Sequence, residues 1–149
     1  MTESAGSSLA QISAGWFVIA TPFDVEVFEH ETLIGTSKSA KTMVASGRHD
    51  LEFVNGTLGY RERHTIEVAP GRITTVWIHA PGGTFSANAR PWADVSVDGR
   101  NVGQTPVSNL VLPIGPHDVV FRHPQLGERR QRILVTLKRA NRLAVDLSK

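Results

Sequence analysis

The sequence predicts an all-β protein built from two small β-sandwich domains in tandem. Apolar and polar residues alternate with a period of two through most apolar stretches, as they do in half-buried strands. Turn-forming residues separate these stretches about every ten residues, which is typical of a small sandwich or barrel. No stretch carries apolar residues at the helical period, so we expect little helix.

The third observation is an internal duplication at an offset of 68 residues. Glycines, a His-Asp pair, a phenylalanine and a Leu-Gly pair recur in the same order. The matches are Gly15/Gly83, Gly35/Gly103, Gly47/Gly115, His49-Asp50/His117-Asp118, Phe53/Phe121 and Leu58-Gly59/Leu126-Gly127. Upstream, we match Pro22 to Pro91 at 69, and Val25 and Val27 to Val95 and Val97 at 70. Ordered matches at near-constant spacing favour duplication over chance.

The duplication divides the chain into three segments. Residues 1–14 have little to bury and are expected to be a mobile N-terminal tail. Residues 15–81 form the first repeat and residues 83–149 the second, with the Pro/Gly-rich boundary Ala80-Pro81-Gly82-Gly83 between them. A unit of this length buries little surface, so we expect the two to pack together across this short linker.

In the first repeat, alternation predicts a strand through Val25 and Val27 and another through Leu51 and Phe53. A strand through Ile66 and Val68 then leads into the turn Pro70-Gly71, and Ile73 to Ile78 forms the last strand.

In the second repeat, the residues Asp94 to Asp98 form the first alternating strand. The dipeptide Asp98-Gly99 then predicts a tight hairpin turn, because both central residues of such a turn need positive φ. Further strands are predicted through Leu110 and Leu112, from His117 to His123, from Ile133 to Leu137 and from Leu143 to Leu147.

Composition excludes several classes of protein. The chain has 149 residues and no cysteine, which excludes a disulfide framework, a zinc–thiolate site and a thiol nucleophile. The longest apolar run, Trp16 to Ala20, is far shorter than a membrane span, and Met1 to Ala14 lacks the pattern of a secretory signal. The net charge of +2 divides into −3 up to Gly82 (six bases, nine acids) and +5 after it (ten bases, five acids).

The segment Arg90 to Pro106 resembles the PEGA domain, a small β-rich module of bacteria and archaea. The residues that carry the resemblance are Pro91 to Asp94 in place of the naming motif, then Asp98-Gly99, Gly103, Thr105-Pro106 and Gly115. Repeat 1 is a degenerate copy that keeps Pro22, Gly35 and Gly47 but lacks the Asp-Gly turn and the Thr-Pro pair.

The resemblance implies two PEGA-like β-sandwiches of immunoglobulin-like or transthyretin-like type. It also implies a non-catalytic accessory module for protein–protein interaction or spacing in a larger bacterial protein, such as a membrane-tethered serine/threonine kinase or a surface protein. The resemblance points to a location in the cell envelope. Met1 to Ala14 shows no signal or anchor, so the sequence does not exclude a cytoplasmic location. It implies no catalytic residue, no cofactor and no metal.

The residues themselves show no convergent chemistry. The pairs His49-Asp50 and His117-Asp118 resemble a metal or general-base pair, but adjacent strand residues point to opposite faces. Their recurrence at matching positions favours a structural role. The six histidines are scattered and are not spaced as a ligand set.

Two alternative binding functions stay open. Trp16, Trp77 and Trp92 could contact a cell-wall glycan, and Trp92, in a turn after Pro91, is expected to be partly exposed or to lie between the repeats, although core packing is the commoner use of such residues. Arg129, Arg130 and Arg132, with Arg139 and Arg142, could bind nucleic acid or anionic lipid. No aromatic residue alternates with these arginines to stack on bases, which disfavours nucleic acid. The protein partner and the oligomeric state are not predicted.

Overall fold

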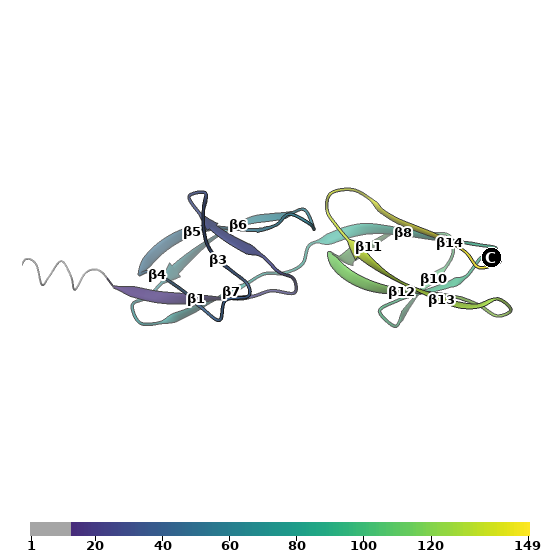
Figure 1. Cartoon of the computed structure of the whole chain (residues 1–149), viewed down its shortest axis with the longest axis horizontal. Coiled ribbons are helices and arrows are strands. Elements are labelled where there is room, and N and C mark those ends of the chain that lie inside the picture. Colours follow the sequence, from purple (N-terminus) through teal and green to yellow (C-terminus); the bar gives the residue numbers. More distant parts are fainter. Residues whose placement is uncertain (1–12) are drawn as a thin grey trace, which may run out of the picture. The chain divides into compact units, whose positions relative to one another are not determined.

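The computed structural model describes residues 13–149, and these form two compact units (Figure 1). The first unit comprises residues 13–56 and 60–79, and the second comprises residues 57–59 and 80–149. The expected N-terminal tail, residues 1–14, lies outside the described residues except for its last two. Of these, Ser13 is bonded to Ser46 through its hydroxyl at 2.6 Å, and Ala14 begins the first strand.

The first unit consists of seven strands in two sheets. They are β1 (Ala14–Ala20), β2 (Glu26–Glu29), β3 (Thr32–Thr36), β4 (Thr42–Ala45), β5 (Gly47–Asn55), β6 (Tyr60–Val68) and β7 (Ile73–Trp77). One sheet has the order β4-β1-β7 and the other the order β3-β2-β5-β6. Only the β1–β7 pair is parallel.

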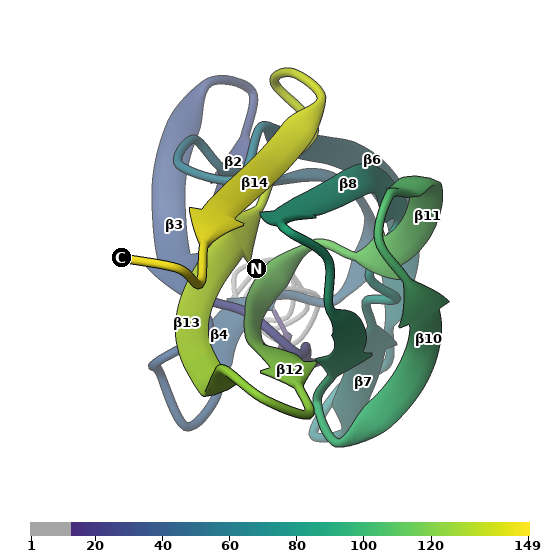
Figure 2. The same ribbon diagram turned by 90° about the vertical axis from the view of Figure 1, so that its right-hand side faces the viewer.

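The second unit repeats this topology strand for strand. Its strands are β8 (Gly82–Arg90), β9 (Asp94–Val97), β10 (Arg100–Gln104), β11 (Val107–Pro113), β12 (Gly115–His123), β13 (Gly127–Val135) and β14 (Asn141–Asp146). The sheet orders are β11-β8-β14 and β10-β9-β12-β13. Figure 2 shows the two sheets as separate layers. The prediction of an all-β chain with two small sandwiches is therefore confirmed.

Each core lies between the two sheets and is built from the inward residues of the alternating strands. In the first unit Phe17, Val27 and Phe53 are fully buried, and Val95 and Phe121 are fully buried in the second. Burying each such side chain contributes about 1.5–3 kcal/mol relative to leaving it exposed. The burial follows the period of two that the sequence predicted.

The strand pairing corrects one detail of the repeat. Val27 pairs with Phe53, and Val95 pairs with Phe121, so β2 and β9 correspond at an offset of 68 and not 70. Val25 therefore corresponds to Ala93. Alternation looks the same after a shift of two residues, so the apolar pattern alone could not separate the two offsets.

Candidate interaction surface

The outer face of the β4-β1-β7 sheet in the first unit is apolar. The strand register places Met43 and Ile73 on either side of Trp16, and it places Trp77 beside Ala20. Met43 is 64% exposed, Ile73 56% and Trp77 66%. Contiguous exposed apolar side chains of this size are typical of an interaction surface.

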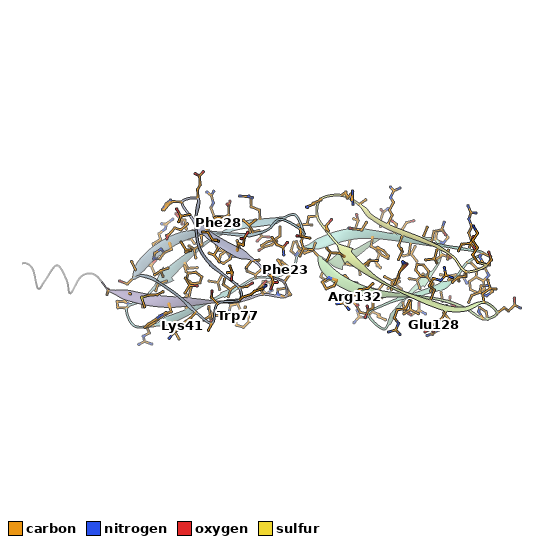
Figure 3. The ribbon with its side chains drawn as sticks, in the orientation of Figure 1. Phe23, Phe28, Lys41, Trp77, Glu128 and Arg132 are labelled. Atoms are coloured by element: carbon orange, nitrogen blue, oxygen red, sulfur yellow. The ribbon has the colours of Figure 1, made fainter. Side chains whose placement is uncertain are left out.

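One cation lies at the margin of this face. The Nζ atom of Lys41 lies 4.4 Å from the centroid of the Trp16 ring, a cation–π contact. Trp77 and Lys41 both project from the outer side of the sheet (Figure 3). The strands β1, β4 and β7 themselves contain no charged residue.

The corresponding face of the second unit is mostly polar, although Val111 of β11 is exposed on it. At the positions that Trp16, Val18 and Ala20 take in β1, strand β8 presents Thr84, Ser86 and Asn88. Arg142 of β14 lies opposite Ser86. The two sheets share strand order and buried positions, so the fold itself does not require an apolar outer face.

The predicted Asp-Gly turn is present and connects β9 to β10. Asp98 has φ 51° and Gly99 has φ 83°, which are the left-handed conformations that a two-residue hairpin turn needs. The first unit forms the same turn with His30 at φ 48° and Glu31 at φ 67°. The degenerate repeat has therefore kept the turn and lost only the residues best suited to it.

The other motif glycines also lie where the backbone is constrained. Gly47 begins β5 and Gly115 begins β12, with φ of 123° and 125°. Gly103 has φ 123° and lies beside a register shift between β9 and β10. Gly35 has the equivalent place in β3, where a Cβ atom would come within 2.8 Å of Thr42 Oγ1.

Thr105 holds the start of β9. Its amide donates to the carbonyl of Ala93 at 2.8 Å, and its hydroxyl accepts from the Ala93 amide at 3.0 Å. Ser37 does the same for Val25 in the first unit, at 2.9 Å for each bond. A serine thus replaces the threonine of the missing Thr-Pro pair.

The prolines of the motif flank these contacts. Pro106 follows Thr105 and comes directly before β11. Pro91 and Pro22 are exposed, and each precedes an aromatic residue in its unit. The motif residues of the second unit therefore form its turns and the connection between its sheets.

A comparison with protein families finds a match for this part of the chain. Residues 89–149 match the PEGA domain. The resemblance that the sequence suggested is confirmed for this PEGA segment, which includes Pro91, Asp98-Gly99 and Thr105-Pro106.

Comparisons with whole proteins add little to the PEGA match. No curated protein matches the chain. Among solved structures, the Bacillus anthracis TIE protein is similar over 91% of this chain, with a TM-score of 0.39 and 14% sequence identity. This chain spans 33% of that chain's length.

Trp92 of the PEGA segment is half-buried and contacts His123. The two ring centroids lie 4.6 Å apart at an angle of 49°. Nδ1 of His123 accepts from the amides of Gln125 and Leu126 at 3.1 and 3.2 Å, which fixes the ring. In the first unit Phe23 packs on Tyr60 with centroids 4.9 Å apart. The indole of Trp92 therefore packs on a ring of its own unit, as Phe23 does in the first unit.

Two of the three candidate arginines on β13 are engaged within the PEGA segment. Arg129 donates to the carbonyls of Asp146 and Lys149, both at 3.2 Å. Arg132 lies 3.6 Å from Asp118. Arg132 and Glu128 both lie on β13 (Figure 3). Arg130 makes no ion pair within residues 13–149, and as an adjacent strand residue it points to the opposite face from Arg129, so the three arginines do not share one face.

The repeated histidines take the structural role that the sequence suggested. His117 contacts Asp98 through Nδ1 at 2.5 Å and the Pro113 carbonyl through Nε2 at 2.6 Å. Asp118, its neighbour in sequence, instead donates its amide to Asp98 at 2.9 Å. The carboxylate of Asp118 lies 3.6 Å from Arg132, so the two side chains of the His-Asp pair have different partners and do not converge on one ion.

Two findings concern the described residues as a whole. Residues 13–149 bring together no cluster of His, Asp or Glu side chains that could hold a metal ion. The same residues contain no helix with the length and apolarity of a membrane span.

The apolar face is only partly visible in the sequence. Trp16 and Trp77 stand out as tryptophans, but Met43 and Ile73 join them only because β1 lies between β4 and β7. These strands are far apart along the chain. A comparison of the outward-facing residues of the two repeats could have identified Met43 and Ile73 from the sequence.

Proposed function

We propose that the chain is a non-catalytic β module that binds another protein and acts as a spacer within a larger bacterial protein. One observation carries the proposal: the outer face of β4-β1-β7 is apolar and exposed, whereas the matched face of the second unit is mostly polar, with Val111 as its exposed apolar side chain. The PEGA segment supports an accessory role, because its motif residues build turns and strand connections.

The same contacts favour a protein partner over a glycan. Stacking on a sugar needs a free aromatic face. Lys41 lies over the ring of Trp16, and His123 lies against the ring of Trp92, so both indoles have contacts within the chain. Trp77 stands on a face with aliphatic neighbours such as Ile73, which resembles the core of a protein interface.

The contacts also disfavour an anionic polymer. Phosphate backbones are bound by several unpaired cations in a row. Arg122 forms an ion pair with Glu128 at 3.0 Å, Arg132 pairs with Asp118, and Arg129 is bonded to backbone carbonyls. Three of the arginines of the basic second repeat are thus engaged within the chain, although ten bases against five acids leave it with a positive charge.

A photo-crosslinking residue at position 43, introduced into the parent protein in its native host, tests the proposal. Position 111 in β11 is the matched control, because Val111 is the counterpart of Met43 and is also exposed, at 66%. We expect a covalent adduct with a different protein from position 43, weakened by Trp77→Ser, and little adduct from position 111.

Equal adducts from the two positions, or none from position 43, would contradict the proposal. Retention of the purified chain on cell-wall glycan that is lost in Trp77→Ser would instead support a carbohydrate-binding function. The family resemblance suggests a kinase or surface protein of the cell envelope as the parent, which the sequence of the complete gene would test.

A further inference from the structure

The open edge of β7 differs from the other sheet edges of this chain. Ile73 to Trp77 contains no charged residue, no proline and no glycine. Natural proteins protect exposed edges with charges, prolines, bulges or covering segments, because an unprotected edge pairs with another strand. None of these devices is found on β7.

The hydrogen bonds to β1 determine which backbone groups of β7 are free. The amide of Trp16 donates to the Arg72 carbonyl at 2.9 Å, and the amide of Ile78 donates to the Ala20 carbonyl at 2.8 Å. In a parallel pair, alternate residues direct both their amide and their carbonyl to the neighbouring strand. Ile73, Thr75 and Trp77 therefore direct both groups to the open edge.

The matched edge in the second unit is protected. Strand β14 carries Arg142 and Asp146, and the Asp146 carbonyl already accepts a hydrogen bond from Arg129 at 3.2 Å. Arg129 lies opposite Phe121, so its counterpart in the first unit is Glu62, which lies opposite Phe53. A carboxylate cannot donate to a carbonyl, so the first unit lacks this bond at His79, the counterpart of Asp146 just beyond the end of β7.

Other edges of the chain are protected in different ways. Strand β4 has only four residues and follows Lys41. Strand β11 has a register shift between Val107 and Leu110 and ends at Pro113. Strand β6 carries several charged side chains, which are Arg61, Glu62, Arg63 and Glu67.

We propose that β7 pairs with β7 of a second copy of this chain, antiparallel about a two-fold axis at Thr75. In this register Thr75 faces Thr75 of the second copy, and Ile73 faces its Trp77. All these are residues whose backbone groups are free, so each pair exchanges two hydrogen bonds. An isologous contact of this kind closes as a dimer.

The side chains match the backbone symmetry. Ile73 and Trp77 are both exposed on the outer face, so the two-fold axis forms aromatic–aliphatic cross-strand pairs, which stabilise antiparallel sheets. Because β7 carries no charge, a second copy brings no like charges together. The symmetry of this strand is the reason for assigning the edge to a second copy rather than to an unrelated strand.

Sedimentation velocity of the intact chain over a wide range of concentration tests the dimer. We expect a reversible change from the 16.3 kDa monomer to twice this mass. Thr75→Lys places two ammonium groups across the axis and should raise the dimer Kd at least about tenfold. Ala144→Lys, at an exposed position of β14 that corresponds to Trp77, should leave the Kd unchanged.

A spin label tests the register independently of any change in folding. The chain has no cysteine, so Thr75→Cys accepts a single label. We expect strong dipolar broadening at concentrations that favour the dimer, and none for a label at Ala144→Cys. A monomer at all concentrations would overturn the inference, as would a dimer that tolerates Thr75→Lys or that keeps the labels at position 75 apart.

Discussion

Nδ1 of His49 lies 2.6 Å from Oε2 of Glu29, while Nε2 of the same ring lies 2.6 Å from the carbonyl oxygen of Ala45. A carboxylate and a carbonyl are both acceptors, so both ring nitrogens must donate and the imidazolium form fits this place. The second unit has the same bridge, with His117 between Asp98 and the Pro113 carbonyl. Each bridge joins a hairpin turn to the end of a strand of the other sheet.

Stability should fall as the pH rises through neutrality. Desolvation lowers the pKa of His49, but the bonds to Ala45 and Glu29 outweigh it, so the pKa is raised above 6.5. A raised pKa in the folded state gives stability that is complete below the unfolded pKa and is lost as the pH rises through the folded pKa. Urea denaturation should show a lower free energy of unfolding at about pH 8 than at about pH 6. His49→Gln should reduce this difference, whereas the exposed control His79→Gln should keep it.

Asp98→Asn should weaken the second unit near neutral pH. The Asp118 amide bond is the largest cause that lowers the pKa of Asp98, and His117 adds to it against a smaller opposing effect of desolvation. A lowered carboxyl pKa contributes stability above the unfolded value of 3.8, and this is lost as the pH falls through the folded pKa. Asparagine tolerates the positive φ of the turn, so the variant removes the charge and keeps the backbone. At acidic pH, the free energy of unfolding of the variant should depend less steeply on pH than that of the wild type. An unchanged dependence would count against this role of Asp98.

Gly99→Val should destabilise the second unit. Gly99 has φ 83°, and a β-branched residue is strained in that region. The cost should be about 1–2 kcal/mol, measured as a shift of the urea midpoint. Gly56→Val serves as a control for the loss of a glycine, since a Cβ atom there has no neighbour within 4 Å. Equal effects of the two changes would argue against a turn-specific strain.

Glu31→Gly should stabilise the first unit. Glu31 is exposed and has φ 67°, a conformation that glycine adopts without strain. The relief is offset in part by the greater chain entropy of glycine in the unfolded state, so the net gain should be up to about 1 kcal/mol. Slower amide exchange in β2 and β3 would support this gain, and a lower midpoint would contradict it.

Gly15→Ala should destabilise the first sheet. A Cβ atom at Gly15 would lie 2.5 Å from both the Ala69 carbonyl oxygen and Cγ1 of Val68. Backbone must move to relieve such a contact, and overpacking of this kind typically costs about 1–3 kcal/mol. Gly56→Ala is the matched control, and hydrogen exchange of β1 amides is the measurement. Unchanged exchange would contradict the prediction, because it would show that the backbone accommodates the added methyl group without loss of stability.

Most strands and the repeat could be predicted because their signals are local. Alternation places Phe53 and Phe121 inside, and Asp98-Gly99 specifies its own turn. The candidate surface could not be predicted to the same extent. Neither Met43 nor Ile73 carries a local sign of being beside Trp16, since strand order is not encoded in the alternation of any single strand.

The sequence by itself determined the all-β class, the duplication and the PEGA resemblance, because period-two patterning and turn chemistry act within a few residues. Only the tertiary structure decided that β2 and β9 correspond at an offset of 68, because pairing separates registers that alternation leaves equivalent. It also decided that Arg129 bonds to the carbonyl of Asp146 at the end of β14, whereas Glu62 takes the place of Arg129 in the first unit. Both decisions depend on contacts between residues distant in the chain, which no local pattern contains.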